Sequence, residues 1–185
     1  MGKILLPAPV KLFIGILASD ASLFRMAEEG LASLFGAIDL KTNAQGIPFT
    51  FTAYYTNEMG NNIKRFFLSF EKSIQPDDIT GIKIKTNQLE EVIAGEANAK
   101  VSRPVNLDPG YLAAGKVILA PTKDYAHRIY LKDGIYAEIT LQYRAIKSGG
   151  KEFQAMPWTY PDYCTKEYLD FFNQMRKIYL TQNIQ

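Results

Sequence analysis

The sequence predicts an α+β fold. A single domain, residues 1–185, should form a largely antiparallel sheet of two β-hairpins and additional strands, with about three helices on one face. Hydrophobic residues alternate with a period of two in pairs of neighbouring segments, which is typical of hairpins. Helical spacing of apolar residues appears in three other segments. With 185 residues, 47% of them hydrophobic and 22% charged, the chain has the size and composition of one globular domain.

The first predicted elements are a buried strand and a helix. The run 11–18 is continuously apolar after Lys11, the pattern of a strand covered on both faces. Lys11 and two preceding prolines leave an apolar stretch at the short limit for a signal peptide, so we interpret the run as a strand. Asp20 or Ser22 can cap the following helix, and Gly36 can end it. Its buried face should consist of Leu23, Ala27, Leu31 and Leu34.

A hairpin and a second helix follow. Residues 49–56 alternate in polarity, and residues 65–70 alternate again after a glycine-containing loop at 57–62, so the two segments predict paired strands. A long helix should begin near Pro76, because proline suits the first helical turn. Its apolar face should consist of Ile79, Ile82, Thr86, Leu89 and Ile93.

The middle of the chain and the C-terminal segment complete the fold. Residues 103–107 should be extended and should stop at the turn signal Asp108-Pro109-Gly110. For residues 111–122 we expect a short helix and then a strand through 117–119. A C-terminal helix of about residues 166–180 should pack on the domain. Its apolar face should consist of Tyr168, Phe172, Met175 and Tyr179.

A second hairpin, formed by 127–131 and 135–143, has a register that the apolar pattern predicts. A two-residue turn would pair Ile129 with Glu138 and mix apolar with charged faces. A three-residue loop with Gly134 in the left-handed conformation avoids this mixing. It pairs Ile129 with Ala137, Leu131 with Ile135, Arg128 with Glu138, and Tyr130 with Tyr136.

Charge and cysteine content argue against several classes of function. The chain has 21 basic and 19 acidic residues and no basic block, so it carries no specific nucleic-acid signal and no signal for membrane-surface binding. No stretch has the apolar length needed to span a bilayer. Cys164 is the only cysteine, which excludes a disulfide within the chain and fits a cytoplasmic, reducing setting in a bacterium. The sequence indicates no metal site and identifies no cofactor or oligomeric state.

Two local patterns have structural explanations. The segment Gly110–Lys116 has the spacing of a phosphate-binding loop, but Val117 replaces the residue that would hold magnesium, and Tyr111 adds bulk where the backbone should wrap a phosphate. We interpret it as a chance match. His127, the only histidine, falls on the apolar side of its strand in the register above. We interpret it as a hydrogen-bonded core residue, although histidine is also the commonest acid–base group.

Polar side chains concentrate in two neighbouring stretches. Asn106 and Asp108 are two residues apart in an extended segment, so they should point to one side. Asp108 can alternatively cap its own turn. Arg128 and Glu138 should meet across the second hairpin, either as an ordinary ion pair or, together with Tyr136, as part of a binding surface.

From these two stretches we predict a site at the strand ends. The predicted catalytic residues are Asp108 and Glu138, because paired carboxylates can move a proton or hold a metal ion. Arginine suits a phosphate or carboxylate group through its two-pronged guanidinium. The predicted ligand-binding residues are Arg103, Asn106, Lys123, Asp124, Arg128 and Tyr136.

Motifs spread over nearly the whole chain carry a family resemblance. The string Arg103-Pro104-Val105-Asn106-Leu107-Asp108-Pro109-Gly110-Tyr111-Leu112 is followed by Thr122-Lys123-Asp124 and His127-Arg128-Ile129-Tyr130-Leu131. The segments Pro9–Gly15, Tyr54-Tyr55, Glu58-Met59-Gly60, Gly134–Glu138 and Trp158–Tyr163 accompany them. Together these motifs resemble the bacterial family catalogued as domain of unknown function 4416. The resemblance implies no reaction and no catalytic residues.

Two functions stay open. In the first, the protein binds or acts on a small anionic molecule through a polar strand-end pocket, with Arg103, Lys123 and Arg128 as anion contacts. In the second, it is a non-catalytic protein-interaction module that uses an aromatic surface including Trp158–Tyr163. Convergence of the polar residues in one pocket would favour the first, and a flat, tyrosine-lined face would favour the second.

Overall fold

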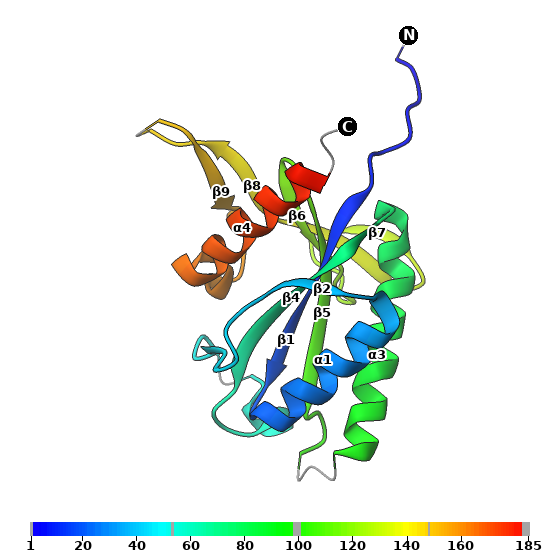
Figure 1. Cartoon of the computed structure of the whole chain (residues 1–185), viewed down its shortest axis with the longest axis vertical. Helices are drawn as coiled ribbons and strands as arrows, with labels where there is room; N and C mark the ends of the chain where they lie inside the picture. The colour runs from blue at the N-terminus through cyan, green and yellow to red at the C-terminus, as the bar shows by residue number, and fades with distance from the viewer. Residues whose placement is uncertain (1, 53, 98–100, 148, 183–185) are drawn as a thin grey trace.

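The computed structural model describes residues 2–52, 54–97, 101–147 and 149–182 (Figure 1). Within them, nine strands form an antiparallel sheet in the order β2-β4-β1-β5-β6-β8-β7, with β3 beside β4 and β9 beside β8. The α+β fold is therefore confirmed. The strands are β1 (Val10–Ala18), β2 (Ile38–Lys41), β3 (Ile47–Pro48), β4 (Lys64–Ile74), β5 (Val105–Ala113), β6 (Lys116–Leu119), β7 (Ile129–Lys132), β8 (Ile135–Ala145) and β9 (Lys151–Ala155).

Helices cover both faces of this sheet, which corrects the expectation that they lie on one. The α-helices are α1 (Ala21–Phe35), α2 (Thr56–Met59), α3 (Ile79–Glu96) and α4 (Lys166–Gln182); η1 (Pro76–Asp78) and η2 (Pro161–Cys164) are short 3-10 turns. The helices α1 and α3 pack on one face, against Ile14 and Ile16 of β1. The helix α4 packs on the other, against Phe13. A strand as continuously apolar as β1 needs cover on both sides, and α4 supplies the second.

The long helices follow the sequence pattern except at Leu34, which is predicted to be buried in α1 but is 44% exposed. Asp20 caps α1, since its carboxylate accepts hydrogen bonds from the backbone N–H groups of Ser22 and Leu23. The helix α3 directly follows the turn η1, at whose first position Pro76 stands. The helix α4 buries the predicted residues Tyr168, Phe172, Met175 and Tyr179, together with Phe171. Among the described residues, no helix has the length and hydrophobicity to cross a membrane.

The first predicted hairpin is wrong in its first strand, whereas its second strand, 65–70, is confirmed as part of β4. Residues 49–52 form no strand, and β4 pairs with β1 on one side and with β2 and β3 on the other. Both edges of β4 are therefore occupied, which leaves residues 49–56 without a partner strand. Position 53 lies outside the described residues. Instead, Phe49 and Tyr55 pack over a small cluster of Leu17, Met59 and Ile63.

The predicted turn at Asp108-Pro109-Gly110 is also wrong, because β5 continues through it. The carbonyl of Pro109 accepts a hydrogen bond from the N–H of Ala120, just beyond the end of β6. In a strand the N–H and C=O of one residue point to the same side, so the missing N–H of Pro109 removes no hydrogen bond between β5 and β1. A side chain at Gly110 would lie 2.4 Å from the carbonyl oxygen of Ile118, so glycine serves close strand packing here. Residues 110–116 form the β5–β6 hairpin rather than a phosphate-binding loop or a short helix, and the predicted strand at 117–119 is confirmed as part of β6.

The second hairpin confirms part of the predicted register. Ile129 pairs with Ala137 and Tyr130 with Tyr136, but Lys132, not Leu131, pairs with Ile135. Both Asp133 and Gly134 have positive φ, so the turn has two residues, and an irregularity between Tyr130 and Lys132 restores the register. The strand β7 is exposed, with Ile129 at 69%, so the buried face expected for this hairpin does not exist in β7.

Candidate functional site

Among the described residues, no strand pairs with the outer edge of the N-terminal half of β5. This half pairs with β1, whereas β6 pairs only from Gly110 onward. Two side chains of α3 satisfy the backbone groups that face outward at Leu107. Its N–H donates to Glu90 Oε1 at 2.6 Å, and its carbonyl accepts from Lys83 Nζ at 2.8 Å. The helix therefore takes the place of a missing strand.

Arg103 extends this contact around the edge of the sheet. Its Nε and Nη2 donate to Glu90 Oε2 at 3.0 and 2.9 Å, and Nη2 also donates to Asn106 Oδ1. Its Nη1 lies 3.9 Å from Glu58. Burial raises the pKa of Glu90 although Arg103 and Lys83 act in the opposite direction. The Glu90 carboxylate is thus held between two cations and a backbone N–H.

Behind Arg103, Asp108 connects to a buried arginine. Asn106 Nδ2 donates to Asp108 Oδ2 at 2.6 Å, and the same oxygen lies 3.0 Å from Arg65 Nη1. Arg65 Nη2 also lies 3.5 Å from Oδ2 of Asp162, a residue of η2. Gly15 on the intervening β1 makes room for this crossing, since a Cβ there would lie 3.0 Å from Arg65 Nη1. We call these seven residues the edge network: Lys83, Glu90, Arg103, Asn106, Asp108, Arg65 and Asp162.

The two aspartates on Arg65 have opposite pKa shifts. Burial acts to raise the pKa of Asp108, but Arg65, Lys83 and Arg103 together hold it below its usual value. Burial raises the pKa of Asp162, and Arg65 offsets this only in part. Burial and the Asp108 carboxylate also raise the pKa of Tyr55 to about 12. Acid–base sites use pairs of carboxyl groups whose pKa values are shifted in opposite directions in this way.

A second cluster, the Glu138 cluster, contains His127, Arg128 and Glu138. Glu138 is 1% exposed and accepts from Arg128 Nε at 2.7 Å, and it lies 3.0 Å from His127 Nε2. Arg128 Nη1 also donates to the carbonyl of Lys123 at 2.9 Å. Through the pairs Gly110–Leu119 and Leu119–Glu138, the Glu138 side chain shares a sheet face with Asp108. His127 lies before β7 and is partly exposed, so its interpretation as a core residue is wrong although its hydrogen bond exists.

Aromatic side chains surround this cluster. The His127 ring stacks between the rings of Tyr125 and Trp158, with centroid distances of 5.9 and 5.3 Å. Lys123 donates to the Tyr54 hydroxyl at 3.2 Å. Trp158 donates to the carbonyl of Ile139, and Asp162, four residues later, reaches Arg65. The segment 158–162 therefore runs over the sheet face from the Glu138 cluster to the edge network.

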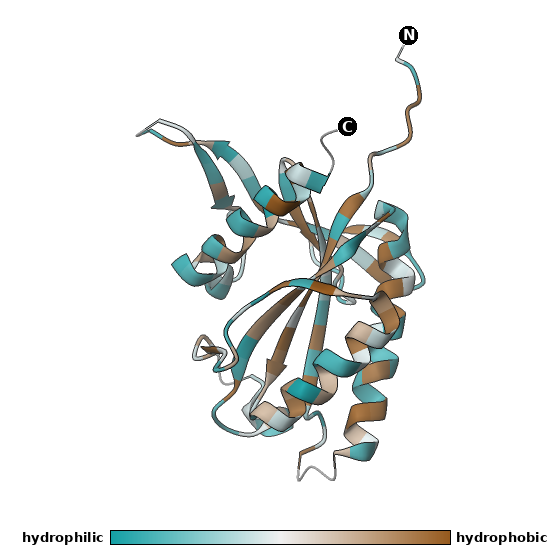
Figure 2. Cartoon of the chain, in the orientation of Figure 1, coloured by the Kyte–Doolittle hydropathy of each residue, from teal (hydrophilic) through white to brown (hydrophobic). Residues whose placement is uncertain are grey.

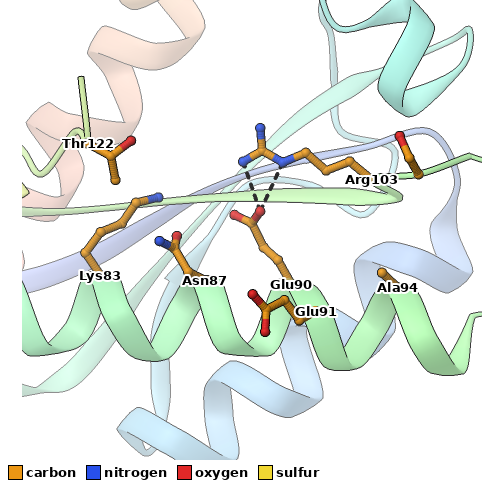
Figure 3. Close-up of a pocket in the computed structure, with 8 residues that line it drawn as sticks. Lys83, Asn87, Glu90, Glu91, Ala94, Arg103 and Thr122 are labelled. Carbon is orange, nitrogen blue, oxygen red and sulfur yellow. Dashed lines mark hydrogen bonds and ion pairs between the residues drawn. The ribbon is translucent and has the colours of Figure 1, made fainter. Parts of the chain in front are cut away.

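A groove opens where α3 meets the outer edge of β5 (Figure 3). It has a volume of about 400 Å³, which is within the range of small-molecule sites. Its polar side chains include Asn87, Ser102 and Thr122, for which no side-chain hydrogen bond is found among the described parts of the chain. We call it the edge groove; it is lined by Lys83, Asn87, Glu90, Glu91, Ala94, Ser102, Arg103 and Thr122.

The predicted site residues fall into two groups rather than one pocket. Arg103, Asn106 and Asp108 join in the edge network, and of all the predicted residues Arg103 alone lines the edge groove. Lys123, Arg128 and Glu138 join in the second group. Asp124 is exposed beside Lys123, and Tyr136 packs edge-on against Tyr130. In the described ranges, no three His, Cys, Asp or Glu side chains converge as a metal site would require.

Sequence reasoning missed the residues that hold these groups. Arg65, Asp162, Glu90 and Lys83 were not predicted as part of a site. One signal was available, because Arg65 directly precedes the apolar run Phe66-Phe67-Leu68 of β4. Gly15, in the middle of the most buried strand, was the matching space.

Comparison with known proteins gives a family and no further relative. A family model described as Domain of unknown function (DUF4416) matches residues 8–179. No curated protein and no solved structure is significantly similar to the chain.

Proposed function

We propose that this chain, which belongs to the family described as Domain of unknown function (DUF4416), binds a small anionic ligand in the edge groove. The ligand carries a phosphate or carboxylate group. A bacterial cytoplasm is the setting that we propose for it, because the family resemblance and the single cysteine both favour one.

The observation that carries the proposal is the state of Arg103. Glu90 and Asn106 hold its Nε and Nη2, so the guanidinium plane has a fixed orientation at the groove wall. Its Nη1 has only the 3.9 Å contact to Glu58 among the described residues. The side chain is one-third exposed. A fixed guanidinium with available N–H donors suits an oxyanion and loses little entropy on binding.

The remaining lining predicts the rest of the ligand. Asn87, Ser102 and Thr122 offer an amide and two hydroxyls on the groove surface, and Figure 3 shows Asn87 on the α3 side and Thr122 beyond Lys83. Glu90 and Glu91 balance the charges of Lys83 and Arg103, so the groove has no large net charge. A small molecule with one anionic group and several hydroxyls, such as a sugar phosphate, matches this mixture.

Any catalytic role falls to Asp108 rather than Glu138. The Asp108 side chain is 32% exposed, whereas Glu138 is 1% exposed and its carboxylate is occupied by Arg128 and His127. Asp108 also has a neighbouring carboxyl group, Asp162, with the opposite pKa shift. Because Asp108 does not line the edge groove, proton transfer requires a ligand that extends past Arg103 and Asn106 to the exposed part of the Asp108 carboxylate.

A thermal-shift screen with sugar phosphates, nucleotides and small carboxylates tests the binding proposal. A ligand of the native state raises the melting temperature. Asn87→Ala should reduce that shift, whereas Gln88→Ala on the same helix should preserve it, because Gln88 does not line the groove. Arg103→Lys should weaken binding while keeping the charge. Equal shifts in all three variants and the unmodified protein would place the ligand elsewhere.

A second candidate function, protein interaction, has one specific observation in its favour. Tyr54, Tyr125 and Tyr160 all lie close enough to Lys123 to raise its pKa, with the Tyr54 hydrogen bond contributing most. These tyrosines are 59%, 46% and 53% exposed. An exposed aromatic surface around a lysine suits a protein partner with an acidic side chain. Cross-links from a partner that map to this surface, and that disappear in Tyr125→Ser/Tyr160→Ser, would support it.

A further inference from the structure

A second groove lies on the opposite side of the molecule from α3, between α4 and the β8–β9 hairpin. In Figure 1 this hairpin projects from the body beside α4, and in Figure 2 it is predominantly hydrophilic. The groove has a volume of about 380 Å³. We call it the basic groove; it is lined by Tyr143, Lys151, Glu152, Asn173, Arg176 and Lys177.

The fold gathers basic residues here from three distant segments. Residues 113–118, 139–151 and 171–182 contain no acidic residue. The turn between β5 and β6 contacts the other two segments, since the carbonyl of Ala114 accepts from Arg176 Nε and that of Gly115 accepts from the N–H of Tyr143. The six basic residues are Lys116, Arg144, Lys147, Lys151, Arg176 and Lys177. The whole chain has a net charge of only +2, so the other residues carry a net charge of −4.

The cations of the basic groove have no acidic partners. In the parts of the chain that the structure describes, Lys151, Arg176 and Lys177 have no carboxylate oxygen within 4.0 Å. Glu152 is the only acidic side chain in the lining. With three cations and one carboxylate the groove is positively charged, and such a groove attracts anionic ligands and raises their association rate.

Arg176 is fixed in position for such a ligand. Its Nε donates to the carbonyl of Ala114 at 2.7 Å, and its guanidinium carbon lies 3.6 Å from the centre of the Tyr143 ring. Neither Nη group has a hydrogen-bond partner among the described residues. The guanidinium therefore presents its two Nη groups at the groove, and its side chain needs no further ordering when a ligand binds. Two such parallel N–H donors match the spacing of two phosphate oxygens.

We propose that the basic groove binds the sugar–phosphate backbone of a nucleic acid, independently of its sequence. Phosphate contacts need cations and no apolar anchor. A protein partner would need such an anchor, and the one aromatic side chain of the groove, Tyr143, is covered by Arg176. A lipid surface is flat, whereas this groove lies between a projecting hairpin and a helix. Because Tyr143 offers no open ring face on the Arg176 side, base stacking contributes little and charge dominates.

Fluorescence anisotropy with a labelled single-stranded RNA of mixed sequence tests the proposal. Three phosphate contacts predict that the logarithm of the association constant falls with the logarithm of the salt concentration with a slope of about −2, so affinity should fall about 20-fold between 50 and 200 mM salt. Lys151→Gln/Lys177→Gln should weaken binding at 50 mM salt by about tenfold or more. The matched control is Lys72→Gln/Lys85→Gln, two exposed lysines outside the groove with the same loss of charge. It should bind nearly as the unmodified protein does.

The other outcomes overturn the proposal. Equal weakening in both double variants would mean that net charge alone attracts the RNA, and no binding at 50 mM salt would exclude the site. Tighter binding to poly-glutamate would assign the groove to an acidic protein segment, and tighter binding to vesicles with anionic headgroups would assign it to a membrane. Asn87→Ala shows that the two proposals can fail separately. It should weaken ligand binding in the edge groove and leave RNA binding unchanged.

Discussion

The edge network and the basic groove use charge in opposite ways. At the edge of β5, Arg103 and Arg65 each contact carboxylates, and Lys83 contacts a backbone carbonyl. In the basic groove, Lys151 and Lys177 are exposed and have no carboxylate partner in the described chain. In the edge network the charges support the fold, and Arg103 keeps only its Nη1 for a ligand, whereas the lysines of the basic groove are wholly available to one. A buried, paired charge becomes costly when its partner is removed, whereas an exposed, unpaired charge can be removed with little effect on stability.

The largest expected effect is the loss of the arginine at the centre of the edge network. Arg65→Met would leave Asp108 and the buried Asp162 without their shared cation. We expect the free energy of unfolding to fall by about 3–5 kcal/mol, measured by urea denaturation. Arg144→Met, beside the basic groove, is the control and should change stability by less than about 0.5 kcal/mol, because Arg144 is exposed. Similar losses in both variants would remove the distinction between the two regions.

A smaller effect should follow from filling the space that Arg65 crosses. In Gly15→Ala, the new methyl group would lie 3.0 Å from Arg65 Nη1 and 3.2 Å from the Phe67 ring. We expect a loss of about 1–3 kcal/mol in unfolding free energy. Gly81→Ala on the exposed side of α3 meets no atom within 4 Å and should raise stability by about 0.5–1 kcal/mol. A stabilised Gly15→Ala would show that the arginine does not depend on this passage.

The sequence predicts those parts of the fold that rest on local periodicity. The β1 strand, the caps of α1 and the apolar face of α4 follow from neighbouring residues and were predicted. Segment 49–56 alternates in polarity like a strand. Whether it forms a strand depends on whether an edge of β4 is free for pairing, which is a property of the whole sheet. In the second hairpin, the two-residue turn and the irregularity at Leu131 compensate each other, so the pairing of Ile129 was predicted from the wrong loop.

The candidate site divides in the same way. Asn106 and Asp108 share one side of a strand, and this follows from their spacing alone. Arg65 lies 43 residues from Asp108, and Asp162 lies 97 residues from Arg65. No local pattern joins them. The basic groove likewise remains invisible in the sequence, because its three cations come from β9 and α4, which are distant in the sequence and each carry a modest charge.

The two aspartates on Arg65 should respond to pH in opposite directions. The pKa of Asp108 is lowered on folding, so its contribution to stability is present above an unfolded-state pKa of about 4 and is lost as the pH falls through its folded value. The pKa of Asp162 is raised, so its contribution is present below about pH 4 and is lost as the pH rises through its folded value. Asp108→Asn should therefore destabilise the protein by about 1–3 kcal/mol at pH 7.

Denaturation of both variants between pH 3 and 7 checks this sign. Relative to the unmodified protein, Asp108→Asn should lose stability as the pH rises, whereas Asp162→Asn should gain it above about pH 4. The hydrogen bond from the Thr165 hydroxyl to residue 162 goes to the backbone carbonyl, so the substitution leaves it in place. Parallel pH profiles would contradict the opposite environments of the two carboxyl groups.

The smallest effect belongs to the basic groove. Lys151→Gln/Lys177→Gln removes two exposed charges that contact no carboxylate, so the unfolding free energy should change by less than about 0.5 kcal/mol. At low salt the double variant should be slightly more stable than the unmodified protein, because each remaining cation then has fewer like charges nearby. This gain should disappear above about 0.5 M salt, because screening removes the repulsion. Urea denaturation at 20 mM and 0.5 M salt measures the gain and its disappearance.

Lys83→Gln in the edge network is the contrasting variant, since Lys83 is buried and donates to the carbonyl of Leu107. It should cost about 1–3 kcal/mol at either salt concentration, because a buried hydrogen bond is lost rather than a screened charge. A salt-dependent loss in the double variant would instead show that the groove lysines stabilise the fold, and the contrast between the two regions would fail.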